Sequence, residues 1–274
     1  MVDSGAKKEP ELPVKDFRRN KIVATVGPSS SSREMLLALM QAGADVFRLN
    51  FSHGQHADLV ETVAAIRELS RNRRRAVAIL GDLQGPKIRT GMMRGGSMAL
   101  TAGQTVVVTT ADVLGEKDLI PTSYQELPQD VSTGDRILLD DGLLELQVEQ
   151  VQDNRVHCRV LVGGELKNRK GMNLPGVKVS APALTEKDLV DLDFSIDQEL
   201  DYLALSFVRS AADVIQLKEL LYQRQSAVRV IAKIEKPEAV ENFSEILEVA
   251  DGIMVARGDL GVEIQPEKVP LIQK

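Results

Sequence analysis

The first part of the chain alternates between short, almost continuously apolar runs and longer segments with a helical period. The apolar runs at 21–27, 45–51 and 76–82 are typical of strands buried on both faces of a parallel sheet. Between them apolar residues recur every three or four positions, as in amphipathic helices. In the second of these segments the apolar positions are Leu59, Val63, Ile66 and Leu69. Serines precede the first segment and Gly43 closes it, which predicts its caps.

This βα rhythm stops after Arg89. From about 90 to 180 the sequence has short β-type runs separated by Gly, Asp and Asn turns, with no convincing helix, which predicts a small all-β module inserted into a loop. The βα rhythm then resumes. The expected elements are a helix at 184–197 and strands at 202–207, 228–235 and 251–256.

The strand ends help to choose between a doubly wound sheet and a barrel. Five strands run into unusual polar residues at their C-terminal ends, where a (β/α)8 barrel gathers its active-site groups. These residues are Arg48 and Asn50, Asp82, Ser206 and Arg209, Lys233 and Glu235, and Arg257 and Asp259. We therefore predict an α/β fold, a (β/α)8 TIM-type barrel of which about six strands are present, with an inserted small all-β domain.

The expected domain organisation follows from these elements. It consists of a flexible N-terminal tail at 1–17, a first barrel part at 18–86, an inserted β-barrel lid domain at 87–182 and a second, truncated barrel part at 183–274. A barrel of eight strands needs two more than the six expected here. We therefore expect the chain to be a fragment of a longer protein.

Lys233, Glu235 and Asp259 form the first candidate site. Lys233 and Glu235 are two positions apart, so both project from the same side of a strand, and Asp259 follows the next strand. Two carboxylates suit Mg²⁺, which leaves its other positions to water and substrate oxygens. A lysine beside them can neutralise a phosphoryl group or an enolate. The alternative is a buried ion triad with a structural role.

The segment RLNFSHG offers Arg48, Asn50, Ser52 and His53 within six residues. Arginine suits phosphate or carboxylate, and Asn and Ser supply hard oxygen ligands. The three histidines have no zinc spacing, and we interpret His53 and His56 as capping residues of the second helix. Together with the first site, these residues predict a Mg²⁺-dependent barrel that handles a small anionic substrate.

Two further basic residues allow two interpretations each. Arg89 is a candidate for binding an anionic substrate or for a salt bridge at the domain junction. In GDLQGPKIR, Asp82 and Lys87 lie five positions apart across a Gly-Pro turn. They could form a salt bridge at the surface, or they could belong to the site.

Composition narrows the possible partners and the compartment. The 274 residues carry a net charge of −6, which argues against nucleic acid as a partner. No apolar stretch is long enough to span a membrane. The one cysteine, Cys158, cannot form an internal disulfide, and we interpret it as a packing residue of a cytoplasmic protein.

The motifs along the chain resemble those of pyruvate kinases, in the same order. They are NKIVATVGPSS, RLNFSHG, GDLQGPKIRTG, DDGLLELQV, KGMNLPG, SAPALTEKDLVDL, AKIE and DGIMVARGDLGVEI. The resemblance implies phosphoryl transfer from phosphoenolpyruvate to ADP, giving pyruvate and ATP, in a cytoplasmic enzyme that uses Mg²⁺ or Mn²⁺. It also implies a lid domain that closes on the nucleotide, and a homotetramer for the full-length enzyme.

The resemblance also implies roles for individual residues. Glu235 and Asp259 would hold the divalent ion, Lys233 would stabilise the transferring phosphoryl group and the enolate, and Arg48 and Arg89 would face the phosphate. The backbone at Ala256, Arg257, Gly258 and Asp259 would hold the substrate carboxylate, and Asn50, His53 and Arg89 would contact the nucleotide.

Many family members also require K⁺, held by residues that match Asn50, Ser52, Asp82 and the position after it. Those enzymes commonly read DTKGPE where this chain reads DLQGPK. Leu83 removes a ligand oxygen, and Lys87 replaces a carboxylate with a cation. The chain thus resembles the K⁺-independent branch, and we expect that K⁺ is not required.

Two alternatives remain at this point. One is a Mg²⁺-dependent aldolase or mutase that acts on pyruvate or phosphoenolpyruvate, although such barrels do not usually carry so large a β-module after the third strand. The other is a non-catalytic binding fragment, because the chain stops at Lys274, before the end of the barrel. We expect the chain alone to have little or no activity.

Overall fold

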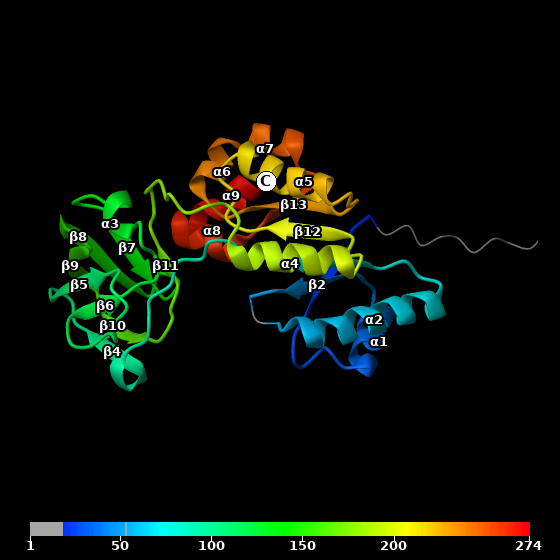
Figure 1. Ribbon diagram of the computed structural model, residues 1–274, viewed down its shortest axis with the longest axis horizontal. Helices are drawn as coiled ribbons and strands as arrows, with labels where there is room; N and C mark the ends of the chain where they lie inside the picture. The colour runs from blue at the N-terminus through cyan, green and yellow to red at the C-terminus, as the bar shows by residue number, and fades with distance from the viewer. Residues whose placement is uncertain (1–18, 53) are drawn as a thin grey trace, which may run out of the picture.

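The computed structural model describes residues 19–52 and 54–274, so the expected tail at 1–17 and His53 lie outside the described residues. Six parallel strands form one curled sheet in the order β1-β2-β3-β12-β13-β14 (Figure 1). Their bounds are Ile22–Val26, Ala44–Asn50, Ala78–Asp82, Tyr202–Leu205, Arg229–Ile234 and Gly252–Val255. Each strand pairs with its neighbour in sequence, as in a barrel, and β12 pairs directly with β3. The predicted strands and the partial TIM-type barrel are confirmed.

Helices connect the strands and cover the outside of the sheet. They are α1 (Arg33–Ala42), α2 (His56–Arg73), α4 (Glu186–Asp197), α5 (Ala211–Gln223), α6 (Pro237–Glu241), α7 (Phe243–Val249), α8 (Arg257–Glu263) and α9 (Val269–Gln273), with a 3-10 turn at Pro266–Lys268. Ser32 caps the start of α1, and Gly43 ends it with φ of 113°. The four apolar positions expected in α2 are all buried against the sheet.

The interpretation of His56 as a helix cap is wrong. The N-cap position of α2 is Gln55, and no side chain caps this end. His56 is instead directed towards α4, where its Nε2 lies 2.7 Å from Asp191 Oδ1 and its ring stacks on Phe194 at 4.2 Å between centroids. The spacing of a histidine before a helix does not reveal a partner 135 positions away in the chain.

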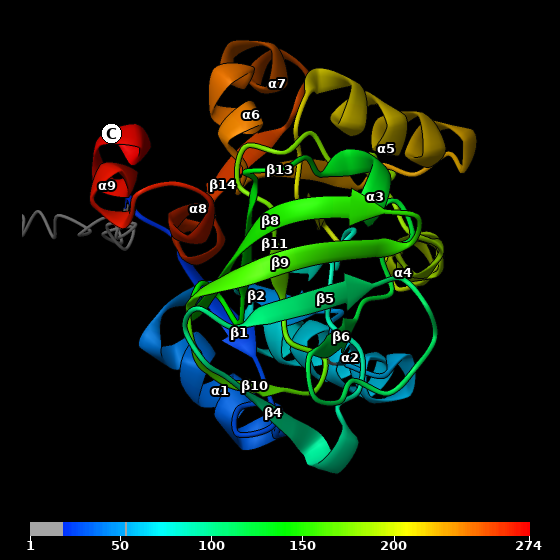
Figure 2. The same cartoon turned by 90° about the vertical axis from the view of Figure 1, so that its left-hand side faces the viewer.

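The segment between β3 and β12 forms a separate inserted module, which we define as elements β4 to β11 (Figures 1 and 2). Its strands are Ser97–Leu100, Thr105–Thr109, Leu119–Pro121, Arg136–Leu139, Leu144–Gln152, Arg155–Val162, Gly164–Lys167 and Met172–Asn173. They make a six-stranded sheet, β11-β7-β8-β9-β5-β6, and the ribbon β10-β4. A 3-10 turn at Arg94–Gly96 precedes them.

The module also contains a helix, α3 (Leu127–Asp130), which the sequence did not predict. The helix has one turn, too short to show a 3.6-residue period, and only Leu127 anchors it in the core. The module has its own hydrophobic core, separate from that of the barrel part. Cys158 is fully buried there, and burial raises the pKa of its thiol to about 12, as expected for a packing residue.

The two chain crossings between barrel part and module meet at Asp188, a buried residue in the first turn of α4. Its Oδ1 accepts a hydrogen bond from the Gly85 N–H at 3.0 Å, on the way into the module. Its Oδ2 accepts from the N–H (2.8 Å) and the hydroxyl (2.6 Å) of Thr185, on the way back. Gly85 has φ of +66°, and a Cβ there would lie 3.0 Å from atoms of Ser206 and Phe207, so the turn requires glycine.

Among the described residues, no helix has the length and apolar character needed to cross a membrane.

Candidate active site

The C-terminal ends of three neighbouring strands bring four polar side chains into one buried cluster. Asp82 ends β3, Ser206 follows β12, and Lys233 and Glu235 lie at the end of β13. Lys233 Nζ lies 2.8 Å from Glu235 Oε1, 3.2 Å from Asp82 Oδ1 and 2.8 Å from Ser206 Oγ. The strand order therefore places an ammonium group between two carboxylates at the end of the sheet where barrels carry active sites.

Arg48 extends this cluster towards solvent. From β2 its Nε donates to Asp82 Oδ2 at 2.6 Å, and its Nη1 donates to Thr25 Oγ1 at 3.0 Å. Asp82 thus lies between two cations, because Lys233 approaches its other oxygen. The Arg48 side chain remains 26 % exposed, so it is not closed off from the open side of the cluster.

The charges in the cluster act against the effect of burial, fully for the pKa of Lys233 and only in part for the pKa of Glu235. Burial by itself lowers the pKa of Lys233, but the carboxylates of Glu235 and Asp82 outweigh it, and the pKa is raised. Burial raises the pKa of Glu235, and the charge of Asp259 adds to this. Lys233 and the Phe207 N–H act in the opposite direction, but the pKa stays raised. Removal of Lys233 would leave buried carboxylate charge without compensation.

Glu235 and Asp259 fit a divalent cation. Glu235 Oε1 is buried and accepts no hydrogen bond, although it is ion-paired with Lys233. The repulsion between Glu235 and Asp259 is the kind that a shared cation removes. The described residues contain no group of three or more His, Cys, Asp and Glu placed to hold a metal. Two carboxylates are nevertheless sufficient for Mg²⁺, which keeps waters or substrate oxygens as its other ligands.

The other carboxylate oxygen of Glu235 is fixed by the backbone. Phe207 N donates to Oε2 at 2.8 Å, and Phe207 has φ of +56°, an uncommon conformation for a bulky residue. Strain of this kind persists where the surroundings over-determine the backbone, often at ligand sites. The turn after β12 therefore orients the glutamate.

Asp259 lies in the first turn of α8, which starts directly after β14 with Ala256 at its N-cap position. The N–H groups of a first helical turn have no partner within the helix, so Arg257, Gly258 and Asp259 present donors at this rim. Asp259 is 39 % exposed at its side chain. The residues predicted to bind a substrate carboxylate thus lie beside the predicted metal ligands.

The residues predicted for a K⁺ site or its lysine substitute have different side-chain partners, although Asn50 and Asp82 are register partners at the ends of β2 and β3. Asn50 Oδ1 accepts from the Ser52 N–H at 3.0 Å, whereas Asp82 contacts Arg48 and Lys233. Lys87 does not form the suggested salt bridge with Asp82. Its Nζ lies 3.7 Å from Asp259 Oδ1. The side chain of Leu83, next to Asp82, is buried in the barrel core. Lys87 therefore brings its charge to the predicted metal ligand.

Two residues predicted to contact the nucleotide remain apart from the cluster or undescribed. Arg89 lies at the base of the inserted module, where its Nη1 donates to the Arg169 carbonyl at 3.2 Å and its backbone pairs with Gly171. No recorded contact among the described residues joins it to Arg48. His53 lies outside the described residues.

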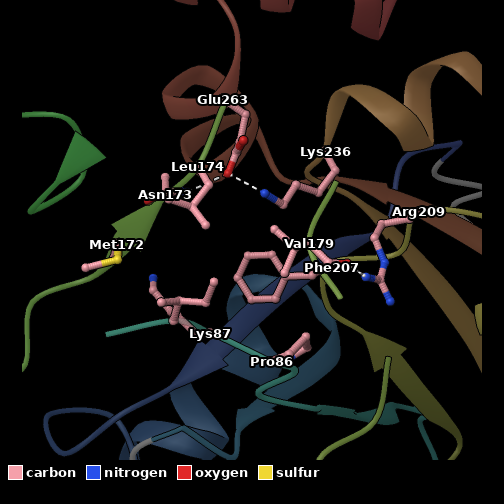
Figure 3. A pocket seen from close by; sticks show the side chains of 11 residues that line it. Pro86, Lys87, Met172, Asn173, Leu174, Val179, Phe207, Arg209, Lys236 and Glu263 are labelled. Atoms are coloured by element: carbon pink, nitrogen blue, oxygen red, sulfur yellow. Dashed lines mark hydrogen bonds and ion pairs between the residues drawn. The ribbon is translucent and has the colours of Figure 1, made fainter. Parts of the chain in front are cut away.

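Sequence reasoning missed a link between module and barrel that forms one wall of a pocket (Figure 3). Glu263 Oε1, at the end of α8, accepts from Lys236 Nζ and from Asn173 Nδ2, both at 2.7 Å. Asn173 belongs to β11 and Lys236 follows Glu235. The available signal was the spacing of Glu263 and Asp259, four residues apart and thus on one face of a helix.

A parallel βα sheet with buried charges at its C-terminal strand ends, interrupted after its third strand by a β-module, defines a TIM-type barrel with an inserted domain. The family model described as "Pyruvate kinase, barrel domain" matches residues 17–274. The chain belongs to the pyruvate kinase family.

Similar proteins agree with this assignment. The pyruvate kinases of Staphylococcus aureus strains USA300 and NCTC 8325 are each 48% identical over 260 residues, which is 94% of this chain and 44% of the relative. A crystal structure of a pyruvate kinase from Cryptosporidium parvum superposes with a TM-score of 0.88 at 43% identity, covering 92% of this chain and 53% of that one. The chain therefore spans about half the length of the relatives it matches.

Proposed function

We propose that this chain is the part of a pyruvate kinase that carries the reacting groups. The reaction is phosphoryl transfer from phosphoenolpyruvate to ADP, which gives pyruvate and ATP. The observation that carries the proposal is the position of Lys233, buried between Asp82 and Glu235 at the strand ends, with Asp259 alongside, in a chain of this family.

The chemistry requires charge neutralisation and alignment more than covalent participation. The bond between phosphorus and the enolate oxygen breaks, a terminal oxygen of ADP forms the new bond to phosphorus, and the enolate then takes up a proton. Lys233, held ionised by its two carboxylates, supplies a cation for the phosphoryl group and the enolate oxygen. Arg48 and Arg89 offer guanidinium donors to phosphate.

We propose Glu235 and Asp259 as the protein ligands of Mg²⁺ or Mn²⁺. When bound, this ion supplies positive charge to phosphate and carboxylate oxygens. The backbone N–H groups of Arg257, Gly258 and Asp259, with Ala256 at the helix cap, would orient the substrate carboxylate. Asn50 and His53, together with Arg89, are the proposed nucleotide contacts.

Independence from K⁺ is a separate part of the proposal. Support comes from the Lys87 ammonium 3.7 Å from Asp259 Oδ1 and from the buried apolar side chain of Leu83. Turnover of the full-length enzyme should be equal, within about twofold, in K⁺ and in tetramethylammonium buffers. The variant Lys87→Glu should lose activity and respond to K⁺. Strong activation of the unmodified enzyme by K⁺ would refute this part alone.

The proposed organisation keeps the sequence-based boundaries: a tail at 1–17, barrel parts at 18–86 and 183–274, and a lid at 87–182. The separate core of the inserted module supports the lid assignment. We also propose a cytoplasmic enzyme that forms a homotetramer at full length and has neither nucleic acid nor a membrane as its partner. The inserted module argues against the aldolase or mutase alternative.

The experiment compares this chain with the full-length enzyme in an assay of ADP-dependent pyruvate formation. We expect turnover from the full-length enzyme and little or none from this chain, whose relatives are about twice as long. Binding of phosphoenolpyruvate to this chain, measured by calorimetry with Mg²⁺ present, separates a binding fragment from an inert one. Lys233→Met should abolish turnover, whereas Lys218→Met, at a surface ion pair, should not. Pyruvate formation that does not depend on ADP would overturn the proposal.

A further inference from the structure

Arg209, one of the polar residues predicted at the strand ends, does not reach the charged cluster. Its guanidinium turns to the segment by which the chain leaves the inserted module, at the edge of the pocket in Figure 3. Nη1 donates to the Val179 carbonyl at 2.6 Å, and Nη2 donates to the Ala181 carbonyl at 2.9 Å. A strand-end arginine therefore holds two alternate carbonyls of this return segment, which we define as residues 179–181.

The residue between these two carbonyls is held from the opposite side. Ser180 donates from its N–H (2.8 Å) and its hydroxyl (2.5 Å) to the carboxylate of Asp130 in the module. Tyr124 donates its hydroxyl to the same carboxylate. Burial raises the pKa of Asp130, but these hydrogen bonds and the charge of Arg209 outweigh it and lower the pKa. The return segment thus connects a cation of the barrel part to an anion of the module.

The barrel part holds Arg209 in place. Its N–H donates to Asp213 Oδ2 at 2.8 Å, its guanidinium lies 3.8 Å from Asp213 Oδ1, and its carbonyl accepts from Asn242 Nδ2 at 2.8 Å. Asp213 and Asn242 belong to the start of α5 and to the junction of α6 and α7. The planar guanidinium is therefore oriented before it meets the return segment, as a bidentate donor requires.

We propose that Arg209 is a positioning residue that sets the orientation of the inserted module over the barrel end. The entry crossing is held as far as the Gly-Pro turn, by bonds of Leu83 to Ala204 and Ser206 and by the bond from Gly85 to Asp188, and these bonds lie on the barrel side of that turn. Asn173 adds a hydrogen bond from the module to Glu263. The two bonds from Arg209 fix the direction of the return segment. The hydrogen bonds from Ser180 to Asp130 attach the module to this segment, so that the orientation of the module follows. The expected effect of Arg209 on turnover rests on the proposed function, whereas its effect on the orientation of the module does not.

The orientation can be measured with two spin labels and pulsed electron double resonance on the full chain. Leu143→Cys in the module and Tyr222→Cys on α5 give label sites that are 69% and 84% exposed. The buried Cys158, with its pKa raised to about 12, does not compete for the reagent. In the labelled parent chain we expect a narrow distance distribution.

Arg209→Met keeps the length of the side chain and removes both donors. We expect the distance distribution to broaden at least twofold, and the amide exchange of residues 177–185 to accelerate about tenfold or more, since hydrogen bonds from a charged donor are lost. The control is Arg224→Met at the end of α5, which removes a surface ion pair with Asp193. It should change neither the distance distribution nor the amide exchange. Arg209→Lys, which can serve only one carbonyl well, should give an intermediate width.

The proposal would be overturned if a folded Arg209→Met protein had the same distance distribution as the parent chain. It would also be overturned if the distance distribution of the parent chain were already as broad as the one expected for Arg209→Met. If Arg209→Met fails to fold, Arg209→Lys decides by the same criterion. In the full-length enzyme the loosened module should raise the KM for ADP about fivefold or more while changing kcat less. Absence of any ADP-dependent turnover in the parent would instead overturn the proposed function and leave the label result valid.

Discussion

The barrel part and the inserted module bury different kinds of groups. In the described barrel part six charged side chains are buried: Asp82, Asp188, Asp191, Lys233, Glu235 and Glu263. In the described module and the segment that leads into it, the buried polar residues are threonines, at 90, 109 and 122, within an otherwise apolar interior. Both parts carry charge on their surfaces, so the difference lies in the interior.

The difference shows that stability is compromised by buried charges in the barrel part and not in the described module. A buried charge costs free energy unless a partner and hydrogen bonds compensate it, and replacing such a pair by apolar groups is often neutral or stabilising. The barrel part keeps these charges close to the strand ends and crossings, where they can bind a substrate or hold the chain. The module, with an apolar core, acts as a folded body that the barrel part positions.

The largest effect should follow from Lys233→Met in the barrel part. This change leaves the buried Glu235 carboxylate without its cation, whereas Asp82 keeps only Arg48, and we expect a loss of about 3–5 kcal/mol of unfolding free energy. Urea denaturation measures it. The control Lys218→Met removes the exposed pair with Asp251 and should cost about 0.2–1 kcal/mol. Equal losses in the two variants would mean that the buried charges of the barrel part matter no more than a surface ion pair.

In the module a comparable effect should come from packing alone. Leu146 is fully buried in β8, and Leu146→Ala should cost about 2–5 kcal/mol through lost burial and a cavity. Leu143→Ala, at a neighbouring exposed position, should change stability by less than about 0.5 kcal/mol. Because no charge is involved, the loss from Leu146→Ala should not vary with pH between 5 and 8. A pH-dependent loss would mean that the module interior is more polar than described.

A smaller effect is expected at the contact between the two parts. Glu263→Gln removes the charge that pairs with Lys236 while keeping an acceptor for Asn173, and it replaces the buried charged Oε2, which accepts no hydrogen bond, by a neutral amide group. These changes oppose each other, so we expect a net loss of about 1–3 kcal/mol. Urea denaturation compares it with Glu267→Gln at an exposed position nearby. A gain in stability would show that the cost of burying the charge outweighs its pairing with Lys236.

The smallest effect is expected at Asp251, in the stability of the protein at low pH. Burial raises the pKa of Asp251, but hydrogen bonds from the Val230 N–H and Lys218 outweigh it, and the pKa is lowered. Its contribution is therefore complete above the ordinary Asp pKa of about 3.9 and is lost as the pH falls through the lower folded value. The slope of the urea midpoint between about pH 4.5 and 2.5 should be shallower in Asp251→Asn. An unchanged slope would contradict this.

The sequence was most informative where the signal is local and periodic. The strands and helices of the barrel part follow from apolar runs and from the 3.6-residue period, and Lys233 and Glu235 could be paired because alternate strand residues share a face. The one-turn helix α3 escaped prediction because a single turn has no period.

Contacts between distant segments could not be predicted in the same way. His56 was expected to cap its own helix and instead pairs with Asp191. For Lys87 the sequence left open a salt bridge with Asp82 or a place in the site, and its ammonium lies next to Asp259. Arg209 was expected at the site and holds a segment of the chain instead. In each case the side chain can reach several partners, and tertiary packing decides which of them it contacts.

Asp188 has a consequence for how this architecture can be altered. Because Gly85 and Thr185 bond to the same carboxylate, the points where the chain leaves and re-enters the sheet are close neighbours. Everything between them is thus a cassette with adjacent ends, the arrangement that tolerates insertion, exchange or deletion of a domain. A short peptide bridge could join the two points and leave the strand-end chemistry uncovered on an otherwise intact scaffold.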